Sequence, residues 1–345
     1  MAVEEMVKVT KVELKETISS ILAKVGVPPE DAEVVAEVMA DTNAKGIESH
    51  GIRWLDIYVQ RIKAGGYNPV TKLEVVKDKG SLLLLNANHG LGQVAMVKAV
   101  DLGLEKARQN AVAIVAVANS NHFGATCFYT ERAAKAGLIG FACTNSTPLM
   151  APWGGMDLCV GTNPLSFGFP TKGVPIILDM ATTAFARGKV FIAERQGTTL
   201  PEGVALNKNG EPTTNPKEAL EGIMLPAAGP KGFGLSLAID ILSGILIGSN
   251  HGHHICSLFG DLDKHQDVGH FAIFINIDDF INPEIYYREI EDSVSRMKSS
   301  RLAKGFTQIF MPGEIEDGQR AKNLAEGIPI PLPTWKTVQE LKAKL

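Results

Sequence analysis

The stretch Asn86–Ala95, NANHGLGQVA, decides between two folds for the middle of the chain. It follows the apolar run 81–85 and precedes a helix-like segment near 93–109, which is the order of a strand, a glycine turn and a helix. In a dinucleotide-binding fingerprint the turn begins at the strand's end, and an acid after the next strand holds a ribose. Here four residues separate the strand from Gly90, and the next apolar run ends in Ala118-Asn119 without an acid. We therefore favour a turn that caps a helix over a Rossmann fingerprint.

Short apolar runs on both sides of this turn predict the strands of one central sheet. They span 81–85, 112–117, 139–144, 164–169, 176–180 and 271–277. Helical patterns lie near 93–109, 127–137, 232–247 and 283–300. The proline-rich tail from Gly327 can only be extended, so we expect it to wrap the surface before a last short helix.

Three helices are expected before the sheet. Thr10 and Glu13 form a capping box for the first, and Pro28-Pro29 opens the second. Ser49 resembles the cap of a third helix that ends at Gly65-Gly66, which places His50 in a helix's first turn.

Composition narrows the class of protein. The chain has 345 residues, of which 45% are hydrophobic, and its net charge of −4 comes from acids and bases mixed along the whole length. This pattern is typical of a soluble globular protein and argues against nucleic acid or a membrane as partner. The four cysteines have no CxxC spacing, and the start of the chain lacks a signal-peptide pattern, so we expect reduced thiols and a cytoplasmic location.

Two histidines are candidates for proton transfer. A helix dipole at His50 would disfavour the charged imidazole, although a histidine that only supplements the Ser49 cap fits equally well. His122, in the polar stretch 119–124, follows an apolar strand at the position where open sheets present ligand groups. An asparagine-rich turn with a hydrogen-bonded histidine is the alternative for that stretch.

Two further stretches suggest ligands. Lys231 enters an apolar helix after a glycine-proline turn, which suits a pyrophosphate, but a tight loop with a surface lysine has the same pattern. The segment 251–256, HGHHIC, has the imidazole density of a zinc site, to which Asp261, Asp263 and His265 would add ligands. A zinc-dependent hydrolase or lyase is therefore an alternative of a different class, although neighbouring histidines do not easily face one ion.

Eight short motifs together resemble one known family in order and spacing. They are SHG at 49–51, NSNHFG at 119–124, APWGG at 151–155, GTNPLSF at 161–167, LDMATT at 178–183, RGK at 187–189, GPKGFG at 229–234 and MPGE at 311–314. The family is the type-2 malate/L-lactate dehydrogenases, which also includes ureidoglycolate and sulfolactate dehydrogenases.

The resemblance implies an α/β (α+β) fold with a large, mostly antiparallel central sheet flanked by helices, and a non-Rossmann site for NAD(P). It implies a helical, dimerisation lobe from residues 1–75 and 283–345, a sheet and cofactor domain from 76–282, and a homodimer with the active site near the subunit interface. NAD or NADP is the implied cofactor, with NAD slightly favoured, and no metal is implied. The implied cofactor residues are Asn145, Ser146, Asp179, Met180, Ala181, Thr182, Lys231, Gly313 and Glu314.

The implied reaction moves a hydride between nicotinamide and C2 of a small 2-hydroxy or 2-oxo acid, malate and oxaloacetate first, then ureidoglycolate, L-lactate and sulfolactate. His122 and His50 match the histidines that take the catalytic role, and we favour His122 as the base. Ser49, Arg53, Tyr58, Arg187 and Lys189 are the implied substrate-binding residues.

Two departures from the family leave substrate and cofactor open. Many relatives have arginine where this chain has Trp54, and Arg53 comes one residue early, a rotation of about 100° on a helix. Some NAD-using relatives have an acid at the position of Thr147, and its absence leaves NADP possible.

Overall fold

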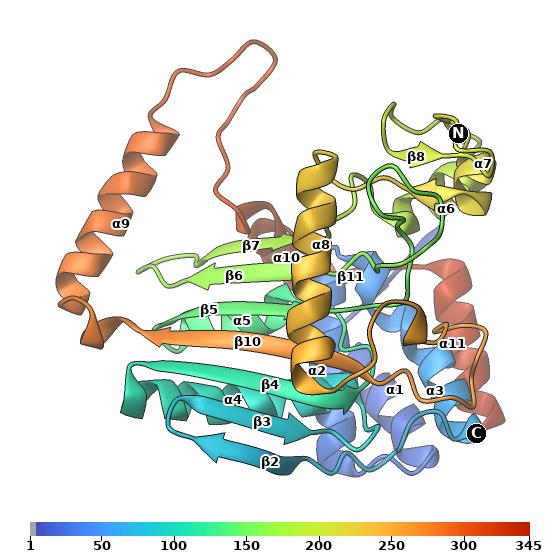
Figure 1. Ribbon diagram of the computed structural model, residues 1–345, viewed down its shortest axis with the longest axis horizontal. Coiled ribbons are helices and arrows are strands. Elements are labelled where there is room, and N and C mark those ends of the chain that lie inside the picture. The colour runs from blue at the N-terminus through green and yellow to red at the C-terminus, as the bar shows by residue number, and fades with distance from the viewer. Residues whose placement is uncertain (1–4) are drawn as a thin grey trace.

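The computed structural model describes residues 5–345 and is built around a seven-stranded sheet (Figure 1). The strand order is β2-β3-β4-β10-β5-β6-β7. The bounds are Glu74–Lys79 for β2, Leu82–Asn86 for β3, Val112–Ser120 for β4, Val268–Asn276 for β10, Leu138–Thr144 for β5, Leu165–Phe169 for β6 and Ile176–Met180 for β7. The six expected strands are all present, and β2 was missed because its charged, exposed sequence EVVKDK has no apolar run.

The sheet is mixed, which corrects the expectation of a mostly antiparallel one. Strands β3 and β4 run parallel, whereas the other neighbouring pairs run antiparallel. The parallel pair arises because helix α4, Gly92–Asn110, carries the chain back along one face of the sheet between these strands.

The glycines of the turn between β3 and α4 allow close packing. A Cβ on Gly92 would lie 2.1 Å from the Asn121 carbonyl oxygen, and one on Gly90 would lie 2.7 Å from the Thr71 methyl carbon. Both glycines are buried. They therefore bring the turn against its neighbours and do not open a cradle for a ligand.

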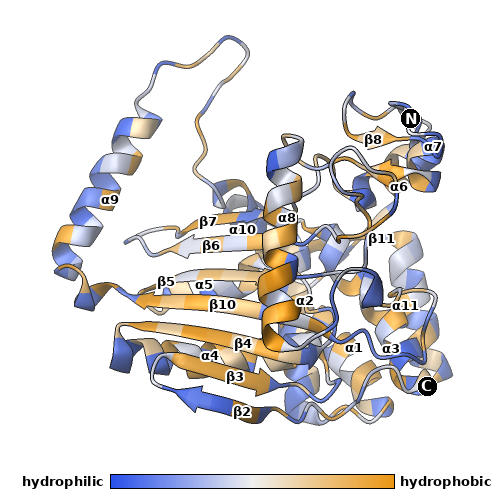
Figure 2. Cartoon of the chain, in the orientation of Figure 1, coloured by the Kyte–Doolittle hydropathy of each residue, from blue (hydrophilic) through white to orange (hydrophobic). Residues whose placement is uncertain are grey.

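Helices on both faces cover the sheet. Helices α4 and α5, Cys127–Lys135, pack on one face, and α8, Pro230–Ser243, crosses the other (Figure 1). The span Pro230–Ile247, which includes the short 3₁₀ helix Ile245–Ile247, is long and apolar enough to cross a membrane (Figure 2). In this fold the buried Asp240 in that span accepts a hydrogen bond from the Gly252 amide at 3.1 Å, which ties α8 to the following loop.

The N-terminal helices and the C-terminal helix share one apolar core. Helix α1 spans Lys11–Lys24, α2 Pro29–Ala44, α3 Leu55–Ala64 and α11 Leu332–Lys344. The capping box is confirmed, since Thr10 Oγ1 accepts from the Glu13 amide at 3.1 Å.

The expected third helix begins later than its pattern suggested. Two 3₁₀ turns, Glu48–His50 and Ile52–Trp54, precede α3. They are separated by Gly51, where a Cβ would lie 2.1 Å from Asn43 Oδ1, and the same oxygen accepts from the Ile52 amide at 2.8 Å. His50 is thus not at an α-helix N-terminus, and the dipole argument for it is wrong.

The proline-rich tail is extended and is followed by a last helix, as expected, and its prolines are partly exposed, whereas its isoleucines turn inward. Residues Ile328–Pro331 form β11, which pairs with β1, Met6–Val9. The IPIP alternation sends both isoleucines to one face, where Ile328 and Ile330 are fully buried in the helical core.

Two parts extend from this body. A small unit contains α6, Arg187–Gln196, β8, Ala205–Leu206, α7, Pro216–Glu221, and β9, Ile223–Met224, around its own apolar cluster. An arm formed by α9, Pro283–Lys298, has no buried residue and returns through a long loop to α10, Glu314–Glu326 (Figure 1). The division into lobes 1–75 with 283–345 and 76–282 stays a prediction.

Candidate active site

A cleft of about 990 Å³ lies where the ends of β4 and β5 meet the 3₁₀ turns before α3. Residues from the helical core and from the small unit both reach it. Its lining includes His50, Arg53, Trp54, His122, Asn145, Ser146, Thr147, Ala181, Thr183, Arg187, Phe259 and Val338. The cleft therefore collects half of the site residues expected from the sequence, both candidate histidines among them.

The two candidate histidines meet in this cleft. Their ring centroids lie 5.7 Å apart and the planes differ by 19°, so the rings are stacked. His122 follows β4, as its sequence predicted, and His50 comes from the first 3₁₀ turn. Burial lowers the pKa of His122 to about 3, with His50 and His270 as further causes. Burial, followed by the Arg53 charge, lowers the pKa of His50 to about 4, and both rings are therefore neutral near pH 7.

Hydrogen bonds hold both rings in place. Tyr58 Oη lies 2.5 Å from His122 Nδ1, and the Gln93 amide nitrogen donates to Tyr58 Oη at 2.9 Å. Ser49 Oγ lies 2.8 Å from His50 Nδ1. With both Nδ1 atoms engaged, each imidazole has its Nε2 left for a ligand.

Cations and aromatic rings share the wall beside the histidines. The Arg53 guanidinium lies 4.9 Å from the Trp54 ring centroid, and this ring packs edge-on to His122 at 6.1 Å. Phe259 also packs against Trp54, with ring centroids 5.3 Å apart and the planes tilted by 46°. Arg187 also lines the cleft, and burial lowers its pKa. Lys189 lies outside the lining, with its ammonium 5.9 Å from the Phe185 ring.

The expected cofactor residues divide into two groups, and the first group lies in the cleft lining or directly next to it in the chain. Asn145, Ser146 and Ala181 line it. The Asn145 side chain is already engaged, since it donates to the Asn250 carbonyl at 2.8 Å and accepts from the Gly269 amide at 3.0 Å. Thr182 lies just behind the lining, where its Oγ1 donates to the Thr162 carbonyl at 2.8 Å. Asp179 and Met180 are the last two residues of β7, just before it in the chain.

The second group lies away from the lining. Lys231 is exposed in the first turn of α8, next to Gly232, whose added Cβ would lie 2.9 Å from the Thr182 carbonyl. Gly313 and Glu314 begin α10, where Glu314 accepts from the Met311 amide at 2.9 Å and pairs with Lys298. The turn that holds Lys231 thus packs against Thr182, whereas Gly313 packs against Ile177 of β7.

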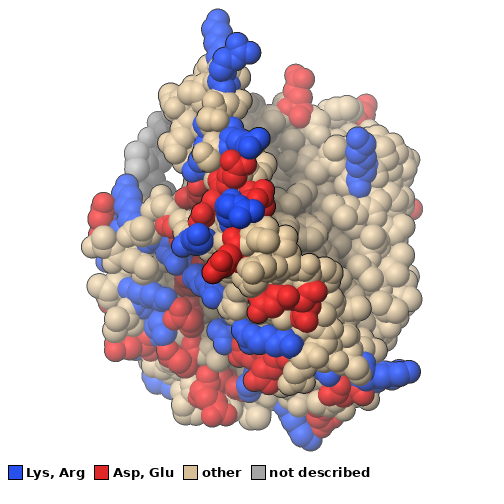
Figure 3. Space-filling view, turned by 90° about the vertical axis from the view of Figure 1, so that its left-hand side faces the viewer, with Lys and Arg blue, Asp and Glu red and all other residues tan. Residues whose placement is uncertain are grey.

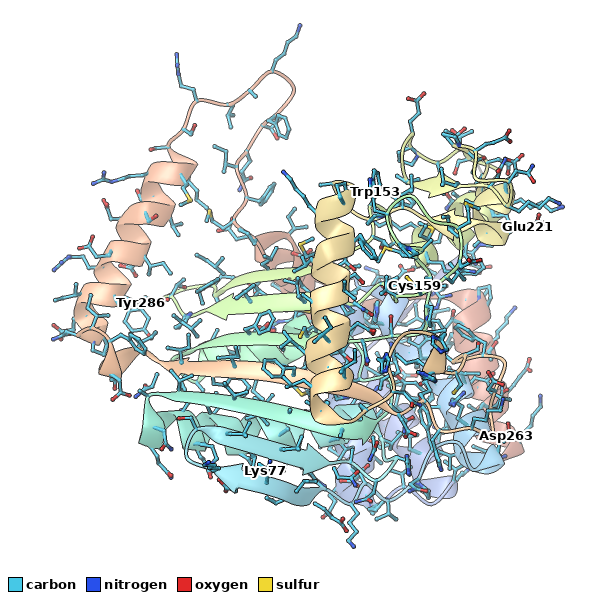
Figure 4. All side chains as sticks on the ribbon, viewed as in Figure 1. Lys77, Trp153, Cys159, Glu221, Asp263 and Tyr286 are labelled. Atoms are coloured by element: carbon cyan, nitrogen blue, oxygen red, sulfur yellow. The ribbon has the colours of Figure 1, made fainter. Side chains whose placement is uncertain are left out.

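The histidine-rich segment does not assemble a metal site. His253 and His254 pack ring to ring at 4.0 Å, and Asp261 pairs with Lys264. Asp263 lies on the loop at the edge of the molecule beside α3 (Figure 4). Within residues 5–345, no three His, Cys, Asp or Glu side chains gather as a metal would require. The zinc-enzyme alternative therefore lacks a ligand set here.

Several residues in the cleft lining, and Gln93 buried behind it, were not expected from the sequence. Gln93 belongs to the opening stretch but reads as an ordinary helix residue, and Phe259 and Val338 come from segments with no motif. The one available signal for Gln93 was that this polar residue stands at the start of a helix among small and apolar residues. No local signal marks Phe259 or Val338, because their approach to the cleft depends on tertiary packing.

The chain is similar to known proteins over almost its whole length. A family model described as malate/L-lactate dehydrogenase matches residues 9–339. A malate dehydrogenase of Pyrococcus abyssi is 39% identical, over 95% of this chain and 92% of its own. A ureidoglycolate dehydrogenase (NAD(+)) of Escherichia coli O157:H7 is 36% identical, over 94% of this chain and 92% of its own. The solved sulfolactate dehydrogenase from Methanocaldococcus jannaschii superposes with a TM-score of 0.93 at 37% identity, covering 98% of this chain and 97% of that one.

Proposed function

The chain belongs to the malate/L-lactate dehydrogenase family, and from this premise we propose that it transfers a hydride between NAD(P) and C2 of a small 2-hydroxy or 2-oxo acid. The observation that supports this most is the convergence of His50 and His122, with Arg53 beside them, in one cleft. Malate and oxaloacetate are our first candidates for the substrate pair.

His122 acts as the general base in this proposal. In hydroxy acid oxidation its Nε2 takes the C2 hydroxyl proton, and in the reverse direction the imidazolium returns it to the ketone oxygen. The lowered pKa of His122 keeps the ring unprotonated near pH 7, so that Nε2 is open to the hydroxyl proton, although the same shift disfavours the imidazolium that forms. A substrate carboxylate bound close by would favour the imidazolium by charge attraction and so ease the reverse step.

Arg53 and Arg187 are our candidates for holding the carboxylate. Arg53 lies over Trp54 within the lining, and this position supports its assignment even though it comes one residue earlier than in many relatives. Arg187 approaches from the small unit. A guanidinium binds a carboxylate through two parallel hydrogen bonds and thereby fixes the orientation of C2. Ser49 and His50 then lie next to the carboxylate or hydroxyl of the substrate.

The cofactor fits the polar end of the cleft, where the lining offers small hydroxyl side chains. Thr183 Oγ1 is buried there without a protein partner among the described residues, as expected of a group that binds a ligand. A Cβ on Gly161 would lie 2.3 Å from Ser146 Oγ, so this loop is packed as tightly as its small residues allow. When bound, nicotinamide supplies the hydride acceptor or donor.

We propose that this site is built without a Rossmann fingerprint. The buried Gly90 and Gly92 leave no room for a pyrophosphate on their turn. The residues that we assign to the cofactor are Asn145, Ser146, Asp179, Met180, Ala181, Thr182, Lys231, Gly313 and Glu314. Those of these residues that lie outside the lining would contact the cofactor only if a second subunit contributed to the site or the cleft closed. NAD is favoured slightly over NADP, with Thr147 leaving both possible.

A homodimer is part of the proposal because two surfaces of this chain lack a covering. Helix α8 exposes Leu237 and Ile241, four residues apart on one face, and Leu235 and Ile245 add to its exposed apolar surface. The arm of α9 and its loop expose Phe306 and Phe310. Seen from the arm side, charged side chains gather over one region next to a broad area with few of them (Figure 3). Exposed apolar areas of this kind mark subunit contacts, and we place the active site near that contact, in a cytoplasmic enzyme.

A screen of oxaloacetate, pyruvate, oxalurate and sulfopyruvate against NADH and NADPH tests this function. We expect loss of reduced-nicotinamide absorbance, fastest with oxaloacetate. Ureidoglycolate, L-lactate and sulfolactate are the other hydroxy acids that we would test in the oxidative direction. No turnover with any 2-oxo acid and either cofactor would contradict the proposal.

A further inference from the structure

A buried glutamine completes the hydrogen-bond chain behind His122. Gln93 is fully buried in the first turn of α4 and donates from Nε2 to Tyr58 Oη at 2.9 Å. Tyr58 Oη in turn lies 2.5 Å from His122 Nδ1. The other end of the same amide, Gln93 Oε1, is buried and has no partner among the described residues. Such an unpaired oxygen is uncommon and calls for an explanation.

Proton counting shows why the orientation of this amide matters. Tyr58 has one hydroxyl proton, so if Gln93 donates to its oxygen, that proton goes to His122 Nδ1. The single proton of the neutral imidazole then sits on Nε2, which cannot act as a base. A base requires the opposite tautomer, in which Nδ1–H donates to Tyr58 Oη and the Tyr58 proton goes elsewhere.

We propose that Gln93 is the positioning residue that makes His122 competent as a base. Rotation of its amide by half a turn places Oε1 where it accepts the Tyr58 proton, and Tyr58 Oη then accepts Nδ1–H. The two ends of an amide have nearly the same shape, and the rotation sacrifices no existing bond of Oε1. This inference rests on the proposed function, since it assigns a tautomer to the proposed base.

The complete step balances in this arrangement. The O–H bond at C2 breaks and an N–H bond forms at His122 Nε2, while the C2–H electron pair leaves as hydride and a C=O bond forms. The alcohol is oxidised and the nicotinamide is reduced. The imidazolium carries protons on both nitrogens, so its Nδ1–H must be accepted by Tyr58 Oη, while the Tyr58 proton stays on Oη and is donated as a hydrogen bond to Gln93 Oε1. The reverse reaction retraces these transfers.

The groups around His122 do little to stabilise its charged form. His50 stacks on it, His270 on β10 is close enough to lower its pKa, and Tyr67 after α3 bonds the His122 backbone. Burial and both histidines lower the pKa of His122, and Arg53 beside His50 adds positive charge to the same region. An acceptor at the end of the Tyr58 chain acts in the opposite direction by favouring the imidazolium.

Paired substitutions at Gln93 and Tyr58 test the inference. Gln93→Met keeps the shape but removes the acceptor, and we expect kcat to fall by about 10- to 10³-fold, because a general base in the wrong tautomer loses most of its contribution. The substrate KM and the melting temperature should stay close to wild type. Gln93→Glu keeps an acceptor and should recover most of kcat. In a Tyr58→Phe background, Gln93→Met should cause no further loss, since the chain is already broken.

A direct readout of the tautomer complements the kinetics. In wild-type protein labelled with ¹⁵N-histidine, we expect His122 to carry its neutral proton on Nδ1, with the resonance assigned by comparison with His122→Ala. A proton on Nε2, or Gln93→Met with wild-type kcat, would overturn the inference. If His122→Ala is inactive while both Gln93 variants behave like wild type, only this inference fails. If His122→Ala keeps full activity, the proposed function itself fails.

Discussion

Mild acid should destabilise this fold steeply, because the structure holds three histidines neutral. The pKa values of His50, His122 and His270 are lowered from 6.5 to about 4, 3 and 3, with burial as the largest cause for each. The unfolded chain therefore binds more protons than the folded chain as the pH falls below about 6.5. The contribution of the neutral rings is complete above that pH and is progressively lost toward pH 4.

The size of the effect follows from proton linkage. One proton bound only by the unfolded state changes the free energy of unfolding by about 1.4 kcal/mol per pH unit, so three give about 4 kcal/mol per pH unit. Water that reaches His50 and His122 through the cleft reduces this, and we expect about 2–4 kcal/mol per pH unit near pH 5. Total stabilities are about 5–15 kcal/mol, so the loss is large. Glu131, whose pKa is lowered to about 2, loses its contribution only at lower pH.

Denaturant unfolding at constant ionic strength from pH 7.5 to 5 measures this slope. His270→Gln should remove about a third of it, because His270 is one of the three groups, and the matched control His253→Gln should not, since His253 is exposed and lies outside the cleft. A free energy of unfolding that stays constant between pH 7 and 5, or a slope unchanged by His270→Gln, would refute the reasoning.

Three substitutions test other parts of the account. Arg53→Ala should raise the substrate KM more than the cofactor KM, because its guanidinium lies in the substrate wall, and the reverse order would place it elsewhere. Ile241→Glu should shift sedimentation from dimer toward monomer, since it places a charge on the exposed apolar surface of α8, while the exposed Glu105→Gln on α4, on the opposite face of the sheet, serves as control. Gly92→Ala should cost about 1–3 kcal/mol of stability, because its Cβ meets the Asn121 carbonyl, without changing cofactor affinity of the folded protein; loss of that affinity alone would revive the fingerprint.

The sequence predicted local structure well where pattern and chemistry agreed. The apolar runs located six of the seven strands of the central sheet, and Thr10 and Glu13 located the start of α1. The parallel pairing of β3 and β4 was not expected, since pairing depends on where α4 returns the chain. The extended course of the IPIP tail followed from its prolines, but the pairing of β11 with β1 and the burial of its two isoleucines were not expected, since they depend on which segments pack against it.

The site was predictable in its motifs but not in its arrangement. His122 was placed correctly at a strand end, and the lowered pKa of His50 was expected for the wrong cause, a helix dipole in place of burial. Gln93 was not singled out because its role appears only when Tyr58 and His122 are brought next to it. No sequence spacing carries that information.

Steady-state oxidation and reduction by His122→Ala, with His50→Ala measured beside it, test the central claim most directly. We predict that His122→Ala lowers kcat by about 10²- to 10⁴-fold in both directions at an unchanged melting temperature, as expected for a lost general acid and base. Wild-type-like kcat in His122→Ala, with the loss confined to His50→Ala, would contradict the assignment of His122 as the base.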